Sequence, residues 1–134
     1  MVVEDIMSED PFAVEVTEPL GEVVEKLLEA DVRHLPVVED GGLVGILSDR
    51  DLRVVAMVAD GRDAVPETVS LSSPVGEIMS ADVLAVNPED DVKVVIDIMI
   101  EEKVGAVPVV EADSSRLVGI VSYIDALRAA RDVV

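Results

Sequence analysis

One stretch decides the fold, RHLPVVEDGGLVGILSDRD at residues 33–51, because it recurs as GAVPVVEADSSRLVGIVSYID at residues 105–125. Each copy holds two short runs rich in β-forming residues, at 34–38 and 43–47 in the first copy. A turn of Glu, Asp and Gly residues joins these runs, which predicts a β-hairpin. The second copy carries two extra residues in its turn.

The duplication extends well beyond the hairpins. Upstream, Ile6-Met7-Ser8 matches Ile78-Met79-Ser80 at a spacing of 72 residues. Between this match and the hairpin, residues 12–16 alternate apolar and acidic, which predicts a short strand. Residues 19–31 place apolar side chains at i, i+3, i+4, i+7 and i+8, which predicts an amphipathic helix. A second helix is expected to begin at Ser48 and to end at about Ala59.

The second copy predicts the same order of elements, β-α-β-β-α, at 83–86, 91–102, 106–111, 116–121 and 123–131. We therefore expect an α/β fold with two repeats that pack about a pseudo-twofold axis and leave a shared cleft. The predicted bounds are residues 1–59 for the first repeat and 75–134 for the second. Residues 60–74 hold Gly, Pro and Ser residues and are expected to form the linker.

The composition is that of a folded acidic protein. The chain has 29 Asp and Glu residues against 10 Lys and Arg residues, a formal charge of −19, and 50% hydrophobic residues. A disordered acidic chain would lack this aliphatic content. The acid excess argues against binding to nucleic acid and to anionic membranes, both of which need clusters of Lys and Arg. It also fits adaptation to high salt, with an acidic mesophilic protein as the open alternative.

Other classes of protein are excluded by what the sequence lacks. There is no cysteine, which excludes disulfides and thiolate metal sites. No apolar run approaches the ~20 residues of a membrane-spanning helix, and the N-terminus is acidic where a signal peptide is basic. We expect a cytoplasmic protein. No nucleophile and base are paired in the sequence, so we expect no enzyme activity.

A Ser-x-x-Asp motif follows each hairpin, as Ser48 with Asp51 and as Ser122 with Asp125. A serine that ends a strand and begins a helix lies beside free N–H groups and the positive end of the helix dipole, where phosphate can bind. The aspartate offers acceptors that suit a vicinal diol such as ribose. The same spacing also forms a capping box. Two copies in matched context favour ligand binding, with capping as the role in the ligand-free state.

These residues resemble a tandem pair of cystathionine β-synthase (CBS) domains, or Bateman module, and the resemblance covers nearly the whole chain. It rests on both copies of the Gly-hydrophobic-x-Ser-x-x-Asp motif. The resemblance implies a regulatory module that senses AMP, ADP, ATP or S-adenosylmethionine in the cleft between the repeats and signals to an unidentified partner. It implies no required cofactor, and it leaves open whether Mg²⁺ accompanies the nucleotide.

The resemblance also implies which residues bind the nucleotide. The serine contacts phosphate or ribose, the aspartate holds the ribose hydroxyls, and residues near the proline of the first hairpin strand line the purine. Carried over to this sequence, these residues are Arg33, His34, Pro36, Ser48, Arg50, Asp51, Gly105, Ala106, Pro108, Ser122 and Asp125.

The two copies differ in the groups that can donate to phosphate, namely Arg33, His34 and Arg50 in the first against Gly105, Ala106 and Ile124 in the second. Guanidinium groups suit phosphate well. Our hypothesis is that the first site binds phosphate, whereas the second binds weakly, binds a neutral adenosyl group or is empty. The alternatives are ordinary salt bridges for the arginines and a hydrogen-bonded strand position for His34.

The second copy also indicates self-association. Val94 and Ile98 lie where the first copy has Glu22 and Lys26, so this helix is apolar on more than its core face. Such a face is usually covered by a partner, and we expect a homodimer. Two other functions remain open: a ligand-free dimerisation or interaction module, and a sensor of divalent cations. Adjacent acidic residues in the helices point apart and are expected to be solvated.

Overall fold

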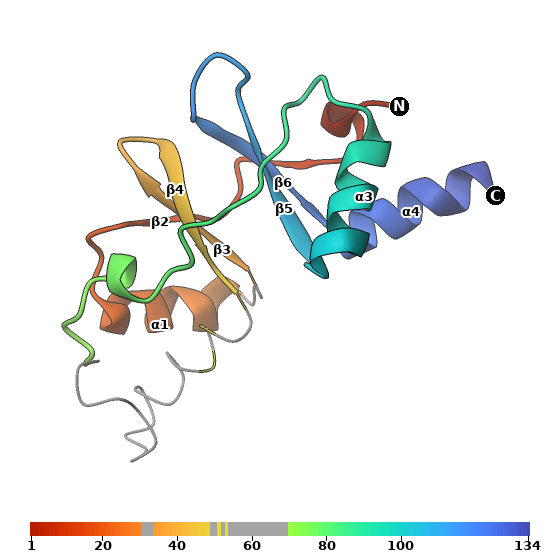
Figure 1. Ribbon diagram of the computed structural model, residues 1–134. Coiled ribbons are helices and arrows are strands. Elements are labelled where there is room, and N and C mark those ends of the chain that lie inside the picture. The colour runs from red at the N-terminus through yellow and green to blue at the C-terminus, as the bar shows by residue number, and fades with distance from the viewer. Residues whose placement is uncertain (31–33, 49–50, 52, 54–69) are drawn as a thin grey trace. The chain divides into compact units, whose positions relative to one another are not determined.

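A computed structural model of the chain is shown in Figure 1. The described residues are 1–30, 34–48, 51, 53 and 70–134. The helix expected after Ser48 therefore lies almost entirely outside the described residues. Within the described part, no helix has the length and the apolar run needed to cross a lipid bilayer.

The chain forms two compact units, and neither is one continuous segment. The N-terminal unit contains residues 12–40 and 44–83, and the C-terminal unit contains residues 1–11, 41–43 and 84–134. The chain thus contributes three separate segments to the C-terminal unit. The repeat bounds expected from the sequence describe a different division, and they stay a prediction.

The described residues of the N-terminal unit include β2 (Val14–Glu15), α1 (Leu20–Ala30), β3 (Leu35–Glu39), β4 (Gly42–Leu47) and the short 3₁₀ helix η2 (Val75–Glu77). The first two residues of β4 are counted with the other unit. The sheet order is β2-β3-β4, with β2 parallel to β3. Its core consists of fully buried aliphatic side chains: Val14, Leu20, Val23, Leu35, Val37, Leu47 and Val75.

The turn between β3 and β4 has the geometry expected from its residues. Asp40 and Gly41 have φ angles of 52° and 82°. Two successive positive φ angles match the right-handed twist of a hairpin, and Asp-Gly is a favoured pair for such a turn. Glycine adopts this backbone at no steric cost. The predicted first hairpin is confirmed.

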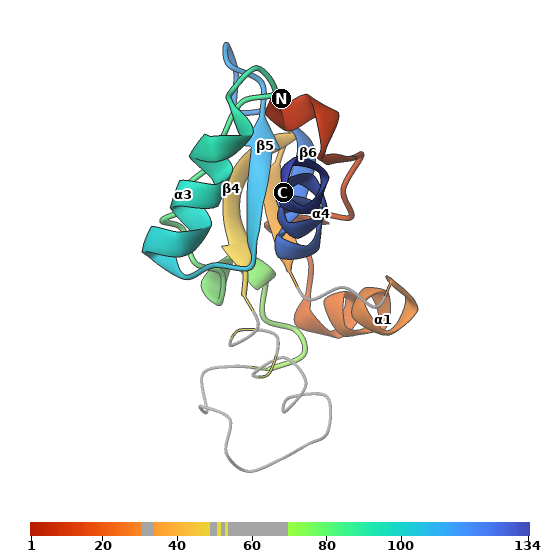
Figure 2. The same ribbon diagram turned by 90° about the vertical axis from the view of Figure 1, so that its right-hand side faces the viewer.

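The C-terminal unit repeats this plan, but its edge strand β1 (Ser8–Glu9) pairs with the second strand of the hairpin and is antiparallel to it. Its other elements are the 3₁₀ helix η1 (Val3–Asp5), α3 (Val92–Glu102), β5 (Ala106–Val110), β6 (Leu117–Ser122) and α4 (Tyr123–Val133). The sheet is antiparallel in the order β1-β6-β5. Helix α3 packs on β5, α4 packs on β6, and the two helices contact each other (Figure 2). The buried core is again aliphatic: Val3, Val86, Val95, Val107, Val109 and Val121.

Each of the duplicated Ile-Met-Ser segments packs on the hairpin of the other sequence repeat. Met7 precedes the first hairpin in sequence but packs over Gly119, which lies in the second hairpin. Met79 precedes the second hairpin and packs over Gly45, which lies in the first. A Cβ atom at Gly119 would lie 2.6 Å from Met7 Sδ and 3.1 Å from the carbonyl oxygen of Ser8. Glycine is therefore required by close approach at both positions.

Two predicted strands are shorter than expected. The run at 12–16 forms only the two residues of β2, and the run at 83–86 forms a single bridge between Val86 and Val109 in the described part. An alternating pattern extends past the point where a neighbouring strand supplies hydrogen bonds, so it overestimates strand length. The bounds of α1, β3, β4, α3, β5, β6 and α4 agree with prediction within two residues at each end. Strand β1 and the two 3₁₀ helices were not predicted. The mixed α/β class is confirmed.

Candidate functional site

The second Ser-x-x-Asp motif forms a closed set of hydrogen bonds at the start of α4. The N–H and Oγ of Ser122 both donate to Oδ2 of Asp125, at 2.9 and 3.0 Å. The N–H of Asp125 donates back to Oγ of Ser122 at 3.2 Å. This is the capping box expected for the ligand-free state.

The first motif repeats the two hydrogen bonds that the serine donates. The N–H and Oγ of Ser48 both donate to Oδ2 of Asp51, each at 3.0 Å. The serine and the aspartate are partly exposed in both motifs. The duplication therefore extends from the sequence to the hydrogen bonds of the predicted site residues.

Each motif leaves one carboxylate oxygen for other partners. In both aspartates the serine bonds use Oδ2, and no hydrogen bond between described residues involves Oδ1. Carboxylate oxygens accept hydrogen bonds from hydroxyl groups, and the two oxygens of one carboxylate can be shared between two donors. The capping box therefore does not prevent the same aspartate from accepting a hydrogen bond from a ligand hydroxyl.

Strand pairing brings four of the predicted residues of the second copy together. Ala106 of β5 is directly opposite Ser122 of β6, and the carbonyl of Gly105 accepts a hydrogen bond of 2.9 Å from the N–H of Tyr123. Gly105 and Ala106 thus lie beside the start of α4, where Ser122 and Asp125 meet. Pro108 lies farther along β5 and is buried. Its carbonyl accepts from the N–H of Val86.

The predicted residues of the first copy are described in part. Arg33 and Arg50, which carry the hypothesis of a phosphate site, lie outside the described residues. Pro36 is buried within β3. His34 is partly buried and has an interaction partner.

Removing the serine hydroxyl from the second motif tests its capping role. For Ser122→Ala we expect the free energy of unfolding to fall by about 1 kcal/mol, because α4 loses an N-cap acceptor. Urea titration followed by circular dichroism measures this change. Ser115→Ala is the control, because Ser115 is exposed and its side chain makes no described hydrogen bond. Equal unfolding midpoints for the two variants would contradict a stabilising cap.

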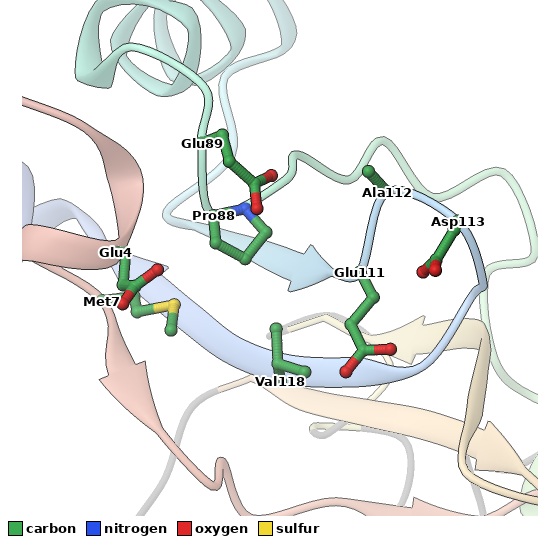
Figure 3. A pocket seen from close by; sticks show the side chains of 8 residues that line it. All are labelled: Glu4, Met7, Pro88, Glu89, Glu111, Ala112, Asp113 and Val118. Carbon is green, nitrogen blue, oxygen red and sulfur yellow. The ribbon is translucent and has the colours of Figure 1, made fainter.

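A cavity of about 690 Å³ lies elsewhere in the C-terminal unit (Figure 3). None of the residues predicted to bind a nucleotide lines it, and the sequence did not predict it. The second hairpin contributes part of the cavity wall. Its turn has two extra residues, and this insertion was the sequence feature that could have indicated a cavity here. Among the described residues, no group of three or more acidic or histidine side chains could hold a metal ion. The lining residues are Glu4, Met7, Pro88, Glu89, Glu111, Ala112, Asp113 and Val118.

Apolar side chains are also exposed on the two helices of the C-terminal unit. The exposed fractions of Val94 and Leu127 are 41% and 61%, and Tyr123 and Ile124 are exposed as well. Ile98, in contrast, is partly buried and packs against the core. The expectation of an apolar outer face is therefore confirmed for Val94 and wrong for Ile98.

The matches to known proteins decide the family. A model of the CBS domain matches residues 3–57 and 75–132. The chain belongs to the CBS domain family. The CBS domain-containing protein YhcV of Bacillus subtilis is 31% identical over 92% of this chain and 81% of its own length. Some curated relatives are longer enzymes. One is the homoserine O-acetyltransferase of Methanocorpusculum labreanum, which is 28% identical to this chain over 91% of this chain and only 23% of its own length.

Solved structures of CBS pairs have the same fold. The crystal structure of CBSX2 in complex with AMP has a TM-score of 0.82 at 26% identity, with 98% of this chain and 97% of that chain covered. The CBS domain pair of MJ0100, in complex with 5′-methylthioadenosine and S-adenosyl-L-methionine, has a TM-score of 0.76 at 27% identity, with 100% and 98% covered. The two-repeat CBS architecture expected from the sequence is confirmed.

Proposed function

We propose that this CBS pair is a regulatory module that binds an adenosyl ligand through its two Ser-x-x-Asp motifs. The observation that carries the proposal is the matched pair of motifs, each with one aspartate oxygen held by serine and the other open to a ligand hydroxyl. The similar CBS pairs bind AMP, or methylthioadenosine and S-adenosylmethionine. All these ligands share an adenine base and a ribose. We further propose that the module acts in the cytoplasm and catalyses no reaction.

The chemistry of the site follows from its groups. The Oδ1 atom of each aspartate accepts from a ribose hydroxyl, while Oδ2 keeps its hydrogen bonds to serine. The helix start supplies N–H groups and a positive dipole end for phosphate or for other acceptors. In the second copy, Gly105 and Ala106 leave space beside the helix start and carry no charge. A phosphate-bearing ligand therefore depends on the first copy, in which Arg33 and Arg50 are the available cations.

Calorimetric titration with AMP, methylthioadenosine and S-adenosylmethionine, each with and without Mg²⁺, tests this function. We expect one of these ligands to bind, and its affinity to fall about tenfold or more in Asp51→Ala or Asp125→Ala, because a hydrogen bond to a charged group is lost. Asp132→Ala is the matched control, since Asp132 is an exposed aspartate of the same helix as Asp125.

The possible outcomes separate the remaining functions. Unchanged affinity in both Asp51→Ala and Asp125→Ala would reject the two motifs as the binding site. No heat from any adenosyl ligand, in a folded protein, would favour the ligand-free interaction module. Heat from Mg²⁺ alone would favour the cation sensor.

We also propose that the protein is a homodimer that associates through the outer faces of α3 and α4. Support comes from the exposed apolar side chains of Val94, Tyr123, Ile124 and Leu127, since faces of this kind usually have a partner. For Leu127→Glu we expect dissociation to the monomer mass, because a charge would enter the interface. Light scattering coupled to gel filtration measures the mass. Leu84→Glu, at an exposed leucine outside the helices, is the control, and an unchanged dimer mass in Leu127→Glu would reject this interface.

A further inference from the structure

The sulfur of Met7 occupies a confined position between the N-terminal segment and β6. Residues 1–11 are held on the C-terminal unit at two places. Near their start, backbone hydrogen bonds join residues 1–4 to residues 88–92, and Val3 is buried. Near their end, Ser8 pairs with Ile120 and Glu9 with Gly119. Met7 adds to this attachment, because its side chain packs over Gly119 and against the buried aliphatic core. On the Gly119 side, the sulfur fills the space that a side chain would take.

The opposite side of Met7 is open. Its side chain is partly exposed and lines the 690 Å³ cavity, together with the carboxylates of Glu4, Glu89, Glu111 and Asp113 (Figure 3). A small solute can therefore reach the thioether from the cavity but not from the glycine side. The carboxylates favour neutral solutes over anions, because their negative charges repel an anion that enters the cavity.

We propose that Met7 is a modification site for neutral hydroperoxides, and that its oxidation loosens the pairing of β1 with β6. The thioether sulfur attacks one oxygen of the hydroperoxide and the O–O bond breaks. That oxygen stays on sulfur as the sulfoxide, and the other leaves as water when the oxidant is H₂O₂. Sulfur loses the two electrons that reduce the peroxide, and methionine sulfoxide reductases reverse the change.

The surroundings of the sulfur explain why the sulfoxide loosens this attachment. The new oxygen is a hydrogen-bond acceptor on the cavity side, where the neighbouring polar side chains are carboxylates, which are acceptors as well. The described residues that line the cavity include no lysine or arginine that could donate to it. Oxidation thus replaces an apolar thioether that packs against the core containing Val3 with a polar group that favours contact with water, at a position held by a strand of only two residues.

The duplication supplies an internal comparison in Met79. This residue corresponds to Met7 in sequence, is also partly buried, and packs over Gly45 in the same way. It is not among the residues that line the cavity. The proposal therefore requires Met7 to react faster than Met79, although both are partly buried methionines that pack over a glycine.

Timed treatment of the whole protein with H₂O₂ tests the proposal, with peptide mass spectrometry to locate the added oxygen. We expect Met7 to be oxidised at least several-fold faster than Met79. The melting temperature should fall by roughly 5 °C, as a loss of about 1 kcal/mol does in a domain of this size. Methionine sulfoxide reductase should restore it. Met7→Leu should keep its melting temperature under peroxide, whereas Met79→Leu should lose as much as the unmodified sequence.

Two results would overturn the proposal: oxidation of Met79 as fast as Met7, or a Met7 sulfoxide with an unchanged melting temperature. Hydrogen exchange gives a second measurement that needs no variant, in case Met7→Leu does not fold. In the oxidised protein, the amides of Ser8 and Ile120 should exchange faster, and unchanged exchange would show that the segment stays attached. This outcome does not depend on whether the CBS pair binds an adenosyl ligand.

Discussion

Val3→Asp is expected to unfold the C-terminal unit or to reduce its free energy of unfolding by about 3–5 kcal/mol. Val3 is fully buried in the core of that unit. A carboxylate there would have neither a cationic partner nor water, and the desolvation of an unpaired charge is costly. Urea unfolding followed by circular dichroism would measure the loss, with one-dimensional NMR to show whether any folded core remains.

The neighbouring residue supplies a matched control. Val2 carries the same side chain one position earlier, but its exposed fraction is 37%, against 0% for Val3. For Val2→Asp we expect a change within about 0.5 kcal/mol, as for most exposed substitutions. If the two variants unfolded at the same urea concentration, residues 1–11 would not belong to the core of the C-terminal unit.

Gly119→Val is expected to destabilise the protein by about 3 kcal/mol, the upper end of the range for overpacking. The first carbon of the new side chain would lie 2.6 Å from Met7 Sδ and 3.1 Å from the carbonyl oxygen of Ser8. The methionine can move aside, but the carbonyl belongs to the strand that pairs with β6 and cannot move without breaking that pairing. Denaturant unfolding measures the change.

A second glycine and a double variant make this test specific. At Gly21 in α1 the nearest atom to an added Cβ is 3.4 Å away, which is ordinary contact, so Gly21→Ala should be neutral or stabilising by up to about 1 kcal/mol. In the smaller Gly119→Ala background, Met7→Ala should cost less than it does alone, because the two side chains compete for one space. Strict additivity of the two substitutions would contradict the close contact.

The sequence allowed accurate prediction wherever a pattern was both local and repeated. The helix expected at 91–102 is observed as α3 at Val92–Glu102, because its apolar periodicity and its capping Asp91 lie within the same few residues. The Asp40-Gly41 turn was predicted for the same reason. The Ser122 and Asp125 constellation was predicted as well, since a capping box requires only residues three apart. Whether a ligand also uses these residues stays a prediction.

The exchange of segments could not be predicted from local patterns. A strand of two residues such as β1 has no periodicity to detect, and its partner β6 lies more than a hundred residues away. The match of Ile6-Met7-Ser8 with Ile78-Met79-Ser80 showed that the segment was duplicated, but not which hairpin it contacts. The cavity was missed for a related reason, because its lining residues come from the N-terminal segment, the loop that precedes α3 and the second hairpin.

The pairing of β1 with β6 also constrains the order of events in folding. The sheet of the C-terminal unit is complete only when Ser8 meets Ile120, so β1 has no partner strand until β6, more than a hundred residues later in the chain, is present. Contacts between such distant residues raise the contact order, which slows folding. Until β6 has been synthesised, the nascent chain exposes the side chain of Met7 and the edge of β1, to which chaperones can bind.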